Sequence, residues 1–140
     1  IGGTGEELDS LVRLAESSGV AERTHFHGFV DNPYPLMKAA TLFVSSSRYE
    51  GFPNGIAEAL SLGTPVVATN CPGGTAELVT HGRNGLLAPV GDHRAFGAMI
   101  KKGLLEATAW SREEIAAAAY RQVGAKRIVQ AYEAVLGAYA

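Results

Sequence analysis

The sequence is short of features that would tie it to a membrane, a disulfide framework or nucleic acid. Its one cysteine, Cys71, cannot form a disulfide within the chain, which favours a reducing compartment. No apolar run approaches the roughly 20 residues that span a bilayer, and no charged segment followed by an apolar one forms a leader. The formal net charge of −2 offers no general attraction to nucleic acid or an anionic membrane. We therefore expect a cytoplasmic protein with no nucleic-acid partner.

The composition is that of an ordinary globular protein. Hydrophobic residues make up 46% of the chain and charged residues 19%, so the chain can bury a core and is not of a disordered type. A length of 140 residues suits one domain. The sequence opens on Ile1 without a methionine, and we interpret it as a piece of a longer protein.

Strand and helix patterns alternate along the first two thirds of the sequence. Apolar runs rich in β-branched or aromatic residues predict buried parallel strands at 24–27, 42–46 and 65–69, with a weaker one at 85–88. Apolar residues at helical spacing predict helices at 6–18, 33–40, 54–62 and 75–79. Because the connections are short, this alternation favours an α/β fold with a parallel sheet.

Past Asp92 the sequence is helical to its end. Ser111 and Glu114 have the spacing of a capping box that starts one of these helices. The last segment carries an apolar stripe that needs a packing partner, formed by Ile128, Val129, Tyr132, Val135, Leu136 and Tyr139. We expect residues 1–140 to form one partial domain, with an α/β core at about 1–92 and a helical tail at 93–140.

A glycine-rich turn opens the chain. Gly2, Gly3 and Gly5 directly precede the first helix, as in a turn that leaves a strand, and glycine permits the tight backbone geometry. Such a turn either contacts a phosphate or is only a tight turn, and the pattern does not choose between them.

The segment 46–60 has the residues that carry chemistry. It leaves the carboxyl end of a predicted strand and enters a helix, which is where ligands collect in open parallel sheets. The free amides of the first helical turn form an anion site together with the helix dipole. Pro53 has no N–H, so any such contact must come from the amides of Asn54, Gly55 and Ile56, and Gly55 lets a ligand approach the backbone.

Two glutamates bracket this segment. Glu50 lies in the loop, and Glu58 lies about one turn into the helix among apolar neighbours, where an unpartnered carboxylate is costly. Ribose hydroxyls are suitable partners because a carboxylate accepts two hydrogen bonds at once. Local capping or pairing explains the two residues equally well from spacing alone.

The order of motifs resembles family 4 of the GT-B glycosyltransferases. The resemblance rests on the pair Glu50-x7-Glu58 and on the segments 26–30, 59–69, 73–79 and 82–87. It covers residues 1–100 well and the helical tail loosely. It implies the C-terminal, donor-binding half of a GT-B fold: a Rossmann-like parallel sheet flanked by helices, truncated at its N-terminal edge.

The resemblance also implies roles for single residues. Glu50 would lie against the donor sugar near the reacting carbon, as the catalytic position, and Glu58 would bind the ribose. Sugar hydroxyls and the diphosphate would be bound by the backbone amides of Phe52, Asn54, Gly55 and Ile56. Gly28, Phe29 and Val30 would flank the base, while Gly2, Gly3 and Gly5 would lie near the phosphates.

Pro53 departs from the family pattern, which has glycine there, and so removes one amide from the sugar site. The form Glu-Gly-Phe-Pro-Asn resembles bacterial polysaccharide and lipid-oligosaccharide enzymes that use UDP-activated hexoses or N-acetylhexosamines. Members of the family retain anomeric configuration. We treat Glu50 as a positioning and electrostatic residue rather than a covalent nucleophile, with the acceptor attacking on the same face.

No Asp-x-Asp motif occurs, so we expect no metal and no cofactor besides the donor substrate. The family instead neutralises the diphosphate with an arginine and a lysine, which would precede Ile1. Lys38 and Arg48 could substitute for them, although solvated surface roles suit both better.

The sequence thus predicts the donor-binding domain of a retaining glycosyltransferase that transfers a hexose or N-acetylhexosamine from a UDP-sugar to a glycan or glycolipid. The expected partners are a nucleotide sugar, a lipid-linked or glycan acceptor and an N-terminal acceptor domain. The whole protein would be cytoplasmic and at most peripheral at the inner membrane face. The 140 residues alone would be inactive. A non-catalytic nucleotide-sugar-binding module and a GT-B sugar-nucleotide epimerase are the alternatives.

Overall fold

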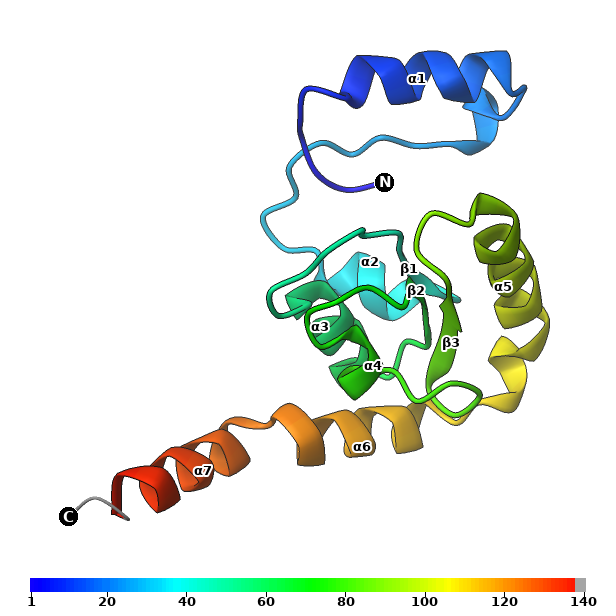
Figure 1. The fold of residues 1–140 in the computed structure, drawn as a ribbon. Helices are drawn as coiled ribbons and strands as arrows, with labels where there is room; N and C mark the ends of the chain where they lie inside the picture. Colours follow the sequence, from blue (N-terminus) through cyan, green and yellow to red (C-terminus); the bar gives the residue numbers. More distant parts are fainter. Residues whose placement is uncertain (138–140) are drawn as a thin grey trace. The chain divides into compact units, whose positions relative to one another are not determined.

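The computed structural model describes residues 1–137, and the chain divides into two compact units, Ile1–Pro35 and Leu36–Ala140 (Figure 1). The sheet lies in the second unit. Whether the 140 residues act as the single domain expected from the sequence stays a prediction.

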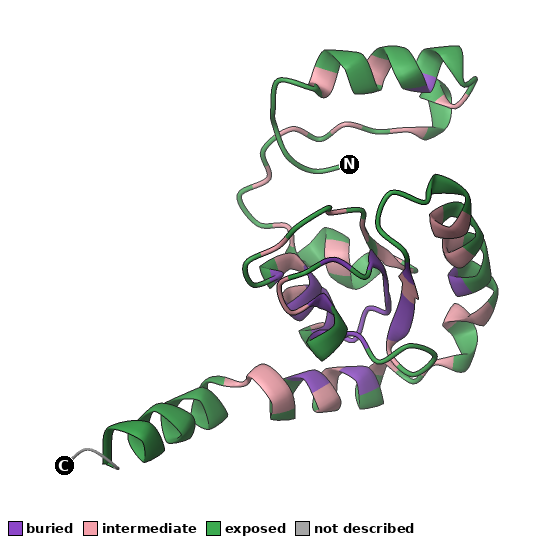
Figure 2. Ribbon diagram, viewed as in Figure 1, coloured by how far each residue is buried: buried purple, intermediate pink, exposed green. Residues whose placement is uncertain are grey.

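The first unit consists of one helix and an extended segment that returns along it. Helix α1, Leu8–Ser17, lies within the predicted helix and is followed by a 3₁₀ turn at Ala21–Arg23. The helix buries only Ala15 within the structure. Figure 2 shows that most of this unit is exposed.

The strand predicted at 24–27 was wrong. The segment is extended, but none of its residues joins a ladder within the described chain, and a parallel bridge forms just after it, between Gly2 and Gly28. The amide of His27 donates to the Ile1 carbonyl at 2.8 Å, and the amide of Gly3 donates to the Gly28 carbonyl at 2.7 Å. Only the first three residues lie opposite this segment. A strand is defined by the ladder it makes with a neighbour, and a single bridge does not make one.

The second unit is built on three parallel strands in the order β1-β2-β3. They are β1, Phe43–Ser45, β2, Val66–Thr69, and β3, Gly85–Ala88. Phe43 pairs with Val66, and Val66 pairs with Gly85. All three lie within segments predicted as strands, including the weak one. Every residue of β2 is buried, as expected for the middle of a parallel sheet covered on both faces.

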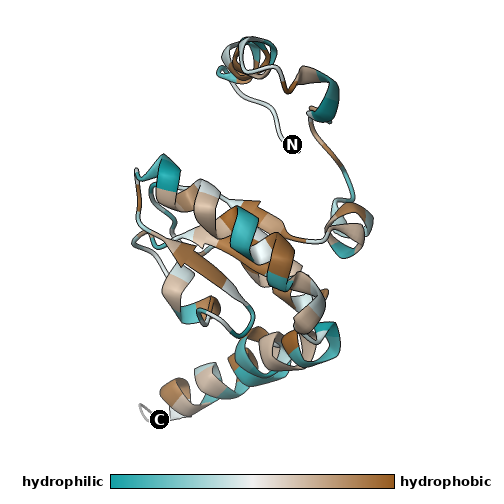
Figure 3. Ribbon diagram, turned by 90° about the vertical axis from the view of Figure 1, so that its right-hand side faces the viewer, coloured by the Kyte–Doolittle hydropathy of each residue, from teal (hydrophilic) through white to brown (hydrophobic). Residues whose placement is uncertain are grey.

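Helices cover both faces of this sheet (Figure 1). Val66 and Ala68 belong to the core cluster shared with helix α3, Asn54–Ser61, and helix α6, Arg112–Val123. Val67 points to the other face, because a Cβ built on Gly103 of helix α5, His93–Glu106, would lie 2.9 Å from its side chain. The alternation follows from the two-residue period of a strand. Figure 3 shows the hydrophobic strands between helices of mixed hydropathy.

Two shorter helices were also predicted. Helix α2, Tyr34–Ala39, lies within 33–40, and the Asn32 side chain accepts a hydrogen bond from the Tyr34 amide at 3.2 Å. Helix α4, Thr75–Leu78, lies within 75–79 and begins after Gly74. Helices therefore alternate with the strands, as the sequence predicted.

Arg112 joins three segments of the second unit. One guanidinium nitrogen donates to the carbonyls of Lys38 and Ala40, at 2.8 and 3.2 Å, and to the Thr64 hydroxyl at 2.7 Å. The end of α2 and the turn before β2 are thereby attached to the first turn of α6.

The C-terminal segment is helical, as predicted. Asp92 caps α5 by accepting from the Ala95 amide at 2.9 Å, and Ser111 caps α6 by accepting from the Glu114 amide at 3.2 Å. Both helices pack on the core, so the helical segment is continuous with the α/β layers. Helix α7, Ala125–Gly137, buries no residue, and the stripe from Ile128 to Leu136 is exposed (Figure 2). Tyr139, the last residue of the predicted stripe, lies outside the described residues.

Candidate functional site

The loop that carries Glu50 is held at the carboxyl ends of β1 and β2. The Thr69 hydroxyl donates to the Ser47 carbonyl, and the Glu50 amide donates to the Pro72 carbonyl at 3.1 Å. Gly73 lies against Glu50 with a φ of +103°, and a Cβ there would overlap the Glu50 carbonyl. The loop after β2 therefore sets the backbone position of Glu50, at the edge of the sheet where the sequence placed a ligand site.

The Glu50 carboxylate is half-buried and has one fixed partner. The Ser47 hydroxyl donates to its Oε1 atom at 2.6 Å, and the Ser45 and Ser47 hydroxyl oxygens are 3.3 Å apart. Among the hydrogen bonds of the described residues, none reaches the second oxygen, Oε2. A carboxylate held by one oxygen keeps the other for a ligand hydroxyl.

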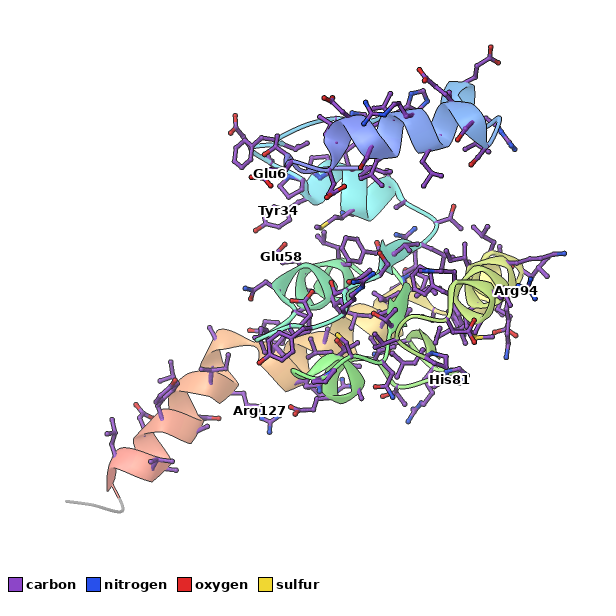
Figure 4. The ribbon with its side chains drawn as sticks, turned by 45° about the horizontal axis from the view of Figure 1, so that its top comes forward. Glu6, Tyr34, Glu58, His81, Arg94 and Arg127 are labelled. Atoms are coloured by element: carbon purple, nitrogen blue, oxygen red, sulfur yellow. The ribbon has the colours of Figure 1, made fainter. Side chains whose placement is uncertain are left out.

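Glu58 has no such partner. It lies in α3 between buried Ala57 and Ala59, is half-buried itself, and makes no side-chain hydrogen bond or ion pair within residues 1–137. Figure 4 shows its side chain projecting outward from α3. Local pairing, which the spacing alone left open, therefore describes Glu50 and does not describe Glu58.

Two of the three amides that the sequence offered for a ligand are bonded within the first turn of α3. The Asn54 amide donates to the Phe52 carbonyl at 2.9 Å, and the Ile56 amide donates to the Pro53 carbonyl at 3.0 Å. Only the Gly55 amide, of these three, has no hydrogen bond within the described chain. The turn at Pro53 uses the other two amides itself, and binding of a ligand by the amides of this turn stays a prediction.

The side chains of this segment point in different directions. Phe52 and Asn54 are exposed, whereas Ile56 belongs to the buried core. The close approach permitted by Gly55 is made by the Phe43 ring, since a Cβ there would lie 3.2 Å from it. Gly55 thus has a packing role that the sequence did not reveal.

The predicted base- and phosphate-facing residues lie in the first unit. The bridge brings Gly2 beside Gly28, and the Gly3 amide is used by the Gly28 carbonyl. The Phe29 side chain is 77% exposed, Val30 is half-buried, and Gly5 is exposed. The turn and the loop therefore meet within this unit, as a site shared between them requires.

Two residues, Ser47 and Gly73, support Glu50 in the structure, and this role was not predicted from the sequence for either. Ser47 stands three positions before Glu50, a spacing at which a hydroxyl can reach a carboxylate, and this signal was present in the sequence. In the sequence, Gly73 is simply the first residue of the motif at 73–79. Its contact with Glu50 joins two loops that no local pattern connects.

A separate cavity of about 280 Å³ lies at the carboxyl edge of the sheet, lined by Ser46, Arg48, Thr69, Pro89, Gly91, Asp92, His93 and Phe96. None of the predicted donor-binding residues lines it. Lys38 and Arg48 are exposed, as expected for solvated cations.

Among the described residues, no group of three metal-ligating side chains lies close enough together to hold an ion. No helix there has the length and hydropathy to cross a bilayer.

Comparison with known proteins connects this geometry to one family. The family described as "Glycosyl transferases group 1" matches residues 1–106. A lipopolysaccharide core biosynthesis glycosyltransferase of Rhizobium meliloti is 39% identical over 100 residues, which are 71% of this chain and 29% of that relative. A poly(glycerol-phosphate) α-glucosyltransferase of Bacillus subtilis is 36% identical over 83 residues, 59% of this chain and 12% of that protein.

Solved structures agree with this match. Anabaena HepE in complex with UDP superposes with a TM-score of 0.87 and 30% identity, over 98% of this chain and 40% of HepE. The lipopolysaccharide outer core galactosyltransferase WaaB is 20% identical and has the same fold, with a TM-score of 0.86. This match also covers 98% of this chain and 40% of WaaB. The chain therefore spans less than half the length of each of these relatives.

Proposed function

The chain belongs to the glycosyl transferases group 1 family, and from this membership we propose that it supplies the donor side of a UDP-sugar-dependent, retaining glycosyltransferase. Its parallel sheet, flanking helices and helical C-terminal segment are the GT-B glycosyltransferase fold that the sequence predicted. The transferred group is a hexose or N-acetylhexosamine, and the acceptor is a glycan or glycolipid.

The observation that carries this proposal is the contrast between the two glutamates. Glu50 is held by Ser47 through one oxygen, whereas Glu58 is half-buried between apolar neighbours without any partner in the described chain. A half-buried carboxylate that projects outward without a protein partner keeps both oxygens free to accept hydrogen bonds from a ligand. The vicinal hydroxyls of a ribose suit Glu58, and a hydroxyl of the donor sugar suits the open oxygen of Glu50.

The choice of donor and acceptor draws on the relatives. HepE was solved with UDP and, in a second crystal, with UDP-glucose, in both cases at 30% identity to this chain. The Rhizobium relative acts in lipopolysaccharide core biosynthesis, and the Bacillus relative is a poly(glycerol-phosphate) glucosyltransferase. These names support a UDP-hexose or UDP-N-acetylhexosamine as donor here and a polymer or lipid-linked glycan as acceptor.

In the proposed reaction, the bond between the anomeric carbon and the diphosphate breaks while negative charge grows on the departing phosphate. A hydrogen-bond donor that points at this growing charge stabilises the transition state. In this chain the free Gly55 amide at the N-terminus of α3 can serve as such a hydrogen-bond donor. Glu50 positions the sugar and stabilises its positive charge, and the acceptor hydroxyl bonds to the face that the phosphate leaves, with its proton passing to the departing diphosphate. The reaction needs no metal.

The chain corresponds to less than half of each relative, which bears on whether it can transfer a sugar by itself. Because the chain corresponds to 40% of HepE, we propose that the acceptor site and the cations facing the diphosphate come from an N-terminal domain outside these 140 residues. The chain alone would then bind nucleotide weakly and transfer nothing. The whole protein would work in the cytoplasm, peripheral at the inner face of the membrane where lipid-linked acceptors lie.

Calorimetric titration of the chain with UDP, UDP-glucose, UDP-N-acetylglucosamine and GDP-mannose tests the proposal. We expect binding of the uridine ligands and weaker or no binding of GDP-mannose. A folded chain that binds none of the four would refute donor binding. Sugar transfer by the 140 residues alone would refute the need for a second domain.

The same protein, extended to its full length, distinguishes the two alternatives. Binding without turnover of any donor would favour a non-catalytic module. Formation of free UDP together with an epimerised sugar, in the absence of acceptor, would favour an epimerase.

A further inference from the structure

Ser47, in the loop that follows β1, has a side chain that contacts the carboxylate of the proposed catalytic residue, Glu50. Its hydroxyl donates to Oε1 of Glu50 at 2.6 Å, a length typical of a hydroxyl bonded to an ionised oxygen. Glu50 has three side-chain torsions and is only half-buried. Without a bond of this kind, its carboxylate would sample several rotamers.

The position of Ser47 is itself set by two strands. Its carbonyl accepts a hydrogen bond from the hydroxyl of Thr69, the last residue of β2, and its hydroxyl oxygen lies 3.3 Å from that of Ser45, the last residue of β1. The Glu50 backbone is held separately, by the Pro72 carbonyl and by Gly73. Glu50 is thus held at two places: the loop after β2 holds its backbone, and Ser47 holds one oxygen of its carboxylate.

We propose that Ser47 is a positioning residue, which orients the Glu50 carboxylate so that Oε2 faces the donor sugar. This inference rests on the proposed function, since it assumes that Glu50 meets the sugar. The hydroxyl occupies one oxygen and leaves the other free, so a sugar hydroxyl arrives at an acceptor that is already in place. A site held in this way loses less entropy on binding.

The test compares the affinities of two ligands, UDP and UDP-glucose, measured by calorimetry on the intact chain. Ser47→Ala should weaken UDP-glucose by about tenfold, from the loss of one hydrogen bond to a partly solvated charge, and leave UDP unchanged. Ser47→Thr keeps a hydroxyl and should restore most of the affinity for UDP-glucose. Ser46→Ala is the matched control: this exposed neighbour makes no side-chain hydrogen bond in the described chain, and its removal should change neither ligand.

A loss for both ligands would indicate a structural role and overturn the inference, as would equal affinities in Ser47→Ala and the wild type.

A double-mutant cycle separates failure of the inference from failure of the proposed function. Glu50→Ala should also weaken UDP-glucose selectively, and Ser47→Ala should have no further effect in that background, because it acts through Glu50. If Glu50→Ala leaves UDP-glucose affinity intact, the role proposed for Glu50 is wrong, and the positioning role fails with it. If Glu50→Ala weakens UDP-glucose and the Ser47→Ala effect adds to it in full, only the positioning role is overturned.

Discussion

Gly73 is the position at which one added methyl group should do most damage to the site. Its backbone has a φ of +103°, and a Cβ there would come well within 3.0 Å of the Glu50 carbonyl, which real Cβ contacts essentially never do. Relief would require Glu50 to move, since the obstacle is backbone rather than a flexible side chain. Such a shift would break the bond from the Glu50 amide to Pro72 and draw the carboxylate away from Ser47.

The size of the effect follows from these contacts. A left-handed conformation costs an alanine about 1–2 kcal/mol, and the stiffer unfolded chain returns about 0.4–1 kcal/mol. Loss of the two hydrogen bonds adds about 1 kcal/mol each, with the one to the half-exposed carboxylate discounted. Gly73→Ala should therefore lower the free energy of unfolding by about 2 kcal/mol and weaken the binding of UDP-glucose while leaving that of UDP unchanged.

Gly82 provides the matched control. Its φ is +81°, and no atom lies within 4 Å of a Cβ built there. Gly82→Ala has the backbone cost alone and should destabilise the protein by about 1 kcal/mol, with ligand affinities unchanged.

Urea unfolding followed by tryptophan fluorescence measures both variants. Trp110, the one tryptophan of the sequence, packs against the core of the second unit and reports its unfolding. Equal destabilisation by the two variants, with UDP-glucose affinity intact in Gly73→Ala, would refute the close contact on which the reasoning rests.

Three further predictions concern other residues and conditions. Arg112→Ala should lower the free energy of unfolding by about 2 kcal/mol, since one guanidinium nitrogen serves three acceptors; the exposed Arg121→Ala is the control, and equal small effects would contradict the proposed link. Glu58→Ala should weaken UDP about tenfold but leave 2′,3′-dideoxy-UDP unaffected, as calorimetry can determine; parallel losses for both ligands would argue against ribose binding. EDTA should leave UDP-glucose affinity unchanged, and a loss restored by Mg²⁺ would show that a metal takes part.

The secondary structure of the second unit could be predicted because it follows from local patterns. The apolar runs at β1, β2 and β3 are short and bounded by turn residues, with β-branched side chains concentrated in β2, and helices α3 and α5 have helical periodicity. The segment 24–27 has a similar pattern and is not a strand. Its pattern describes an extended backbone correctly, but the ladder depends on what lies opposite it.

The candidate site was predictable to the same degree. The pair Glu50 and Glu58 and its place after a strand come from the sequence. The spacing left local pairing open for both glutamates, and the structure gives Glu50 a local partner and Glu58 none within the described residues. The state of each amide in the first turn of α3 did not follow, because the bonds at Pro53 depend on the geometry of the turn.

The sequence by itself determined the α/β alternation, the parallel sheet, the helical C-terminal segment and the family, since each is written in local periodicity or in a contiguous motif. Only the tertiary structure decided what holds Glu50. Ser47 reaches its carboxylate, Pro72 accepts from its amide and Gly73 permits the close approach of the two loops. The contacts with Pro72 and Gly73 join the loops that follow two neighbouring strands, and these loops meet only after the sheet has brought them together, so no window of sequence contains them. The Ser47–Glu50 spacing is local, and there the structure decided only that the bond forms.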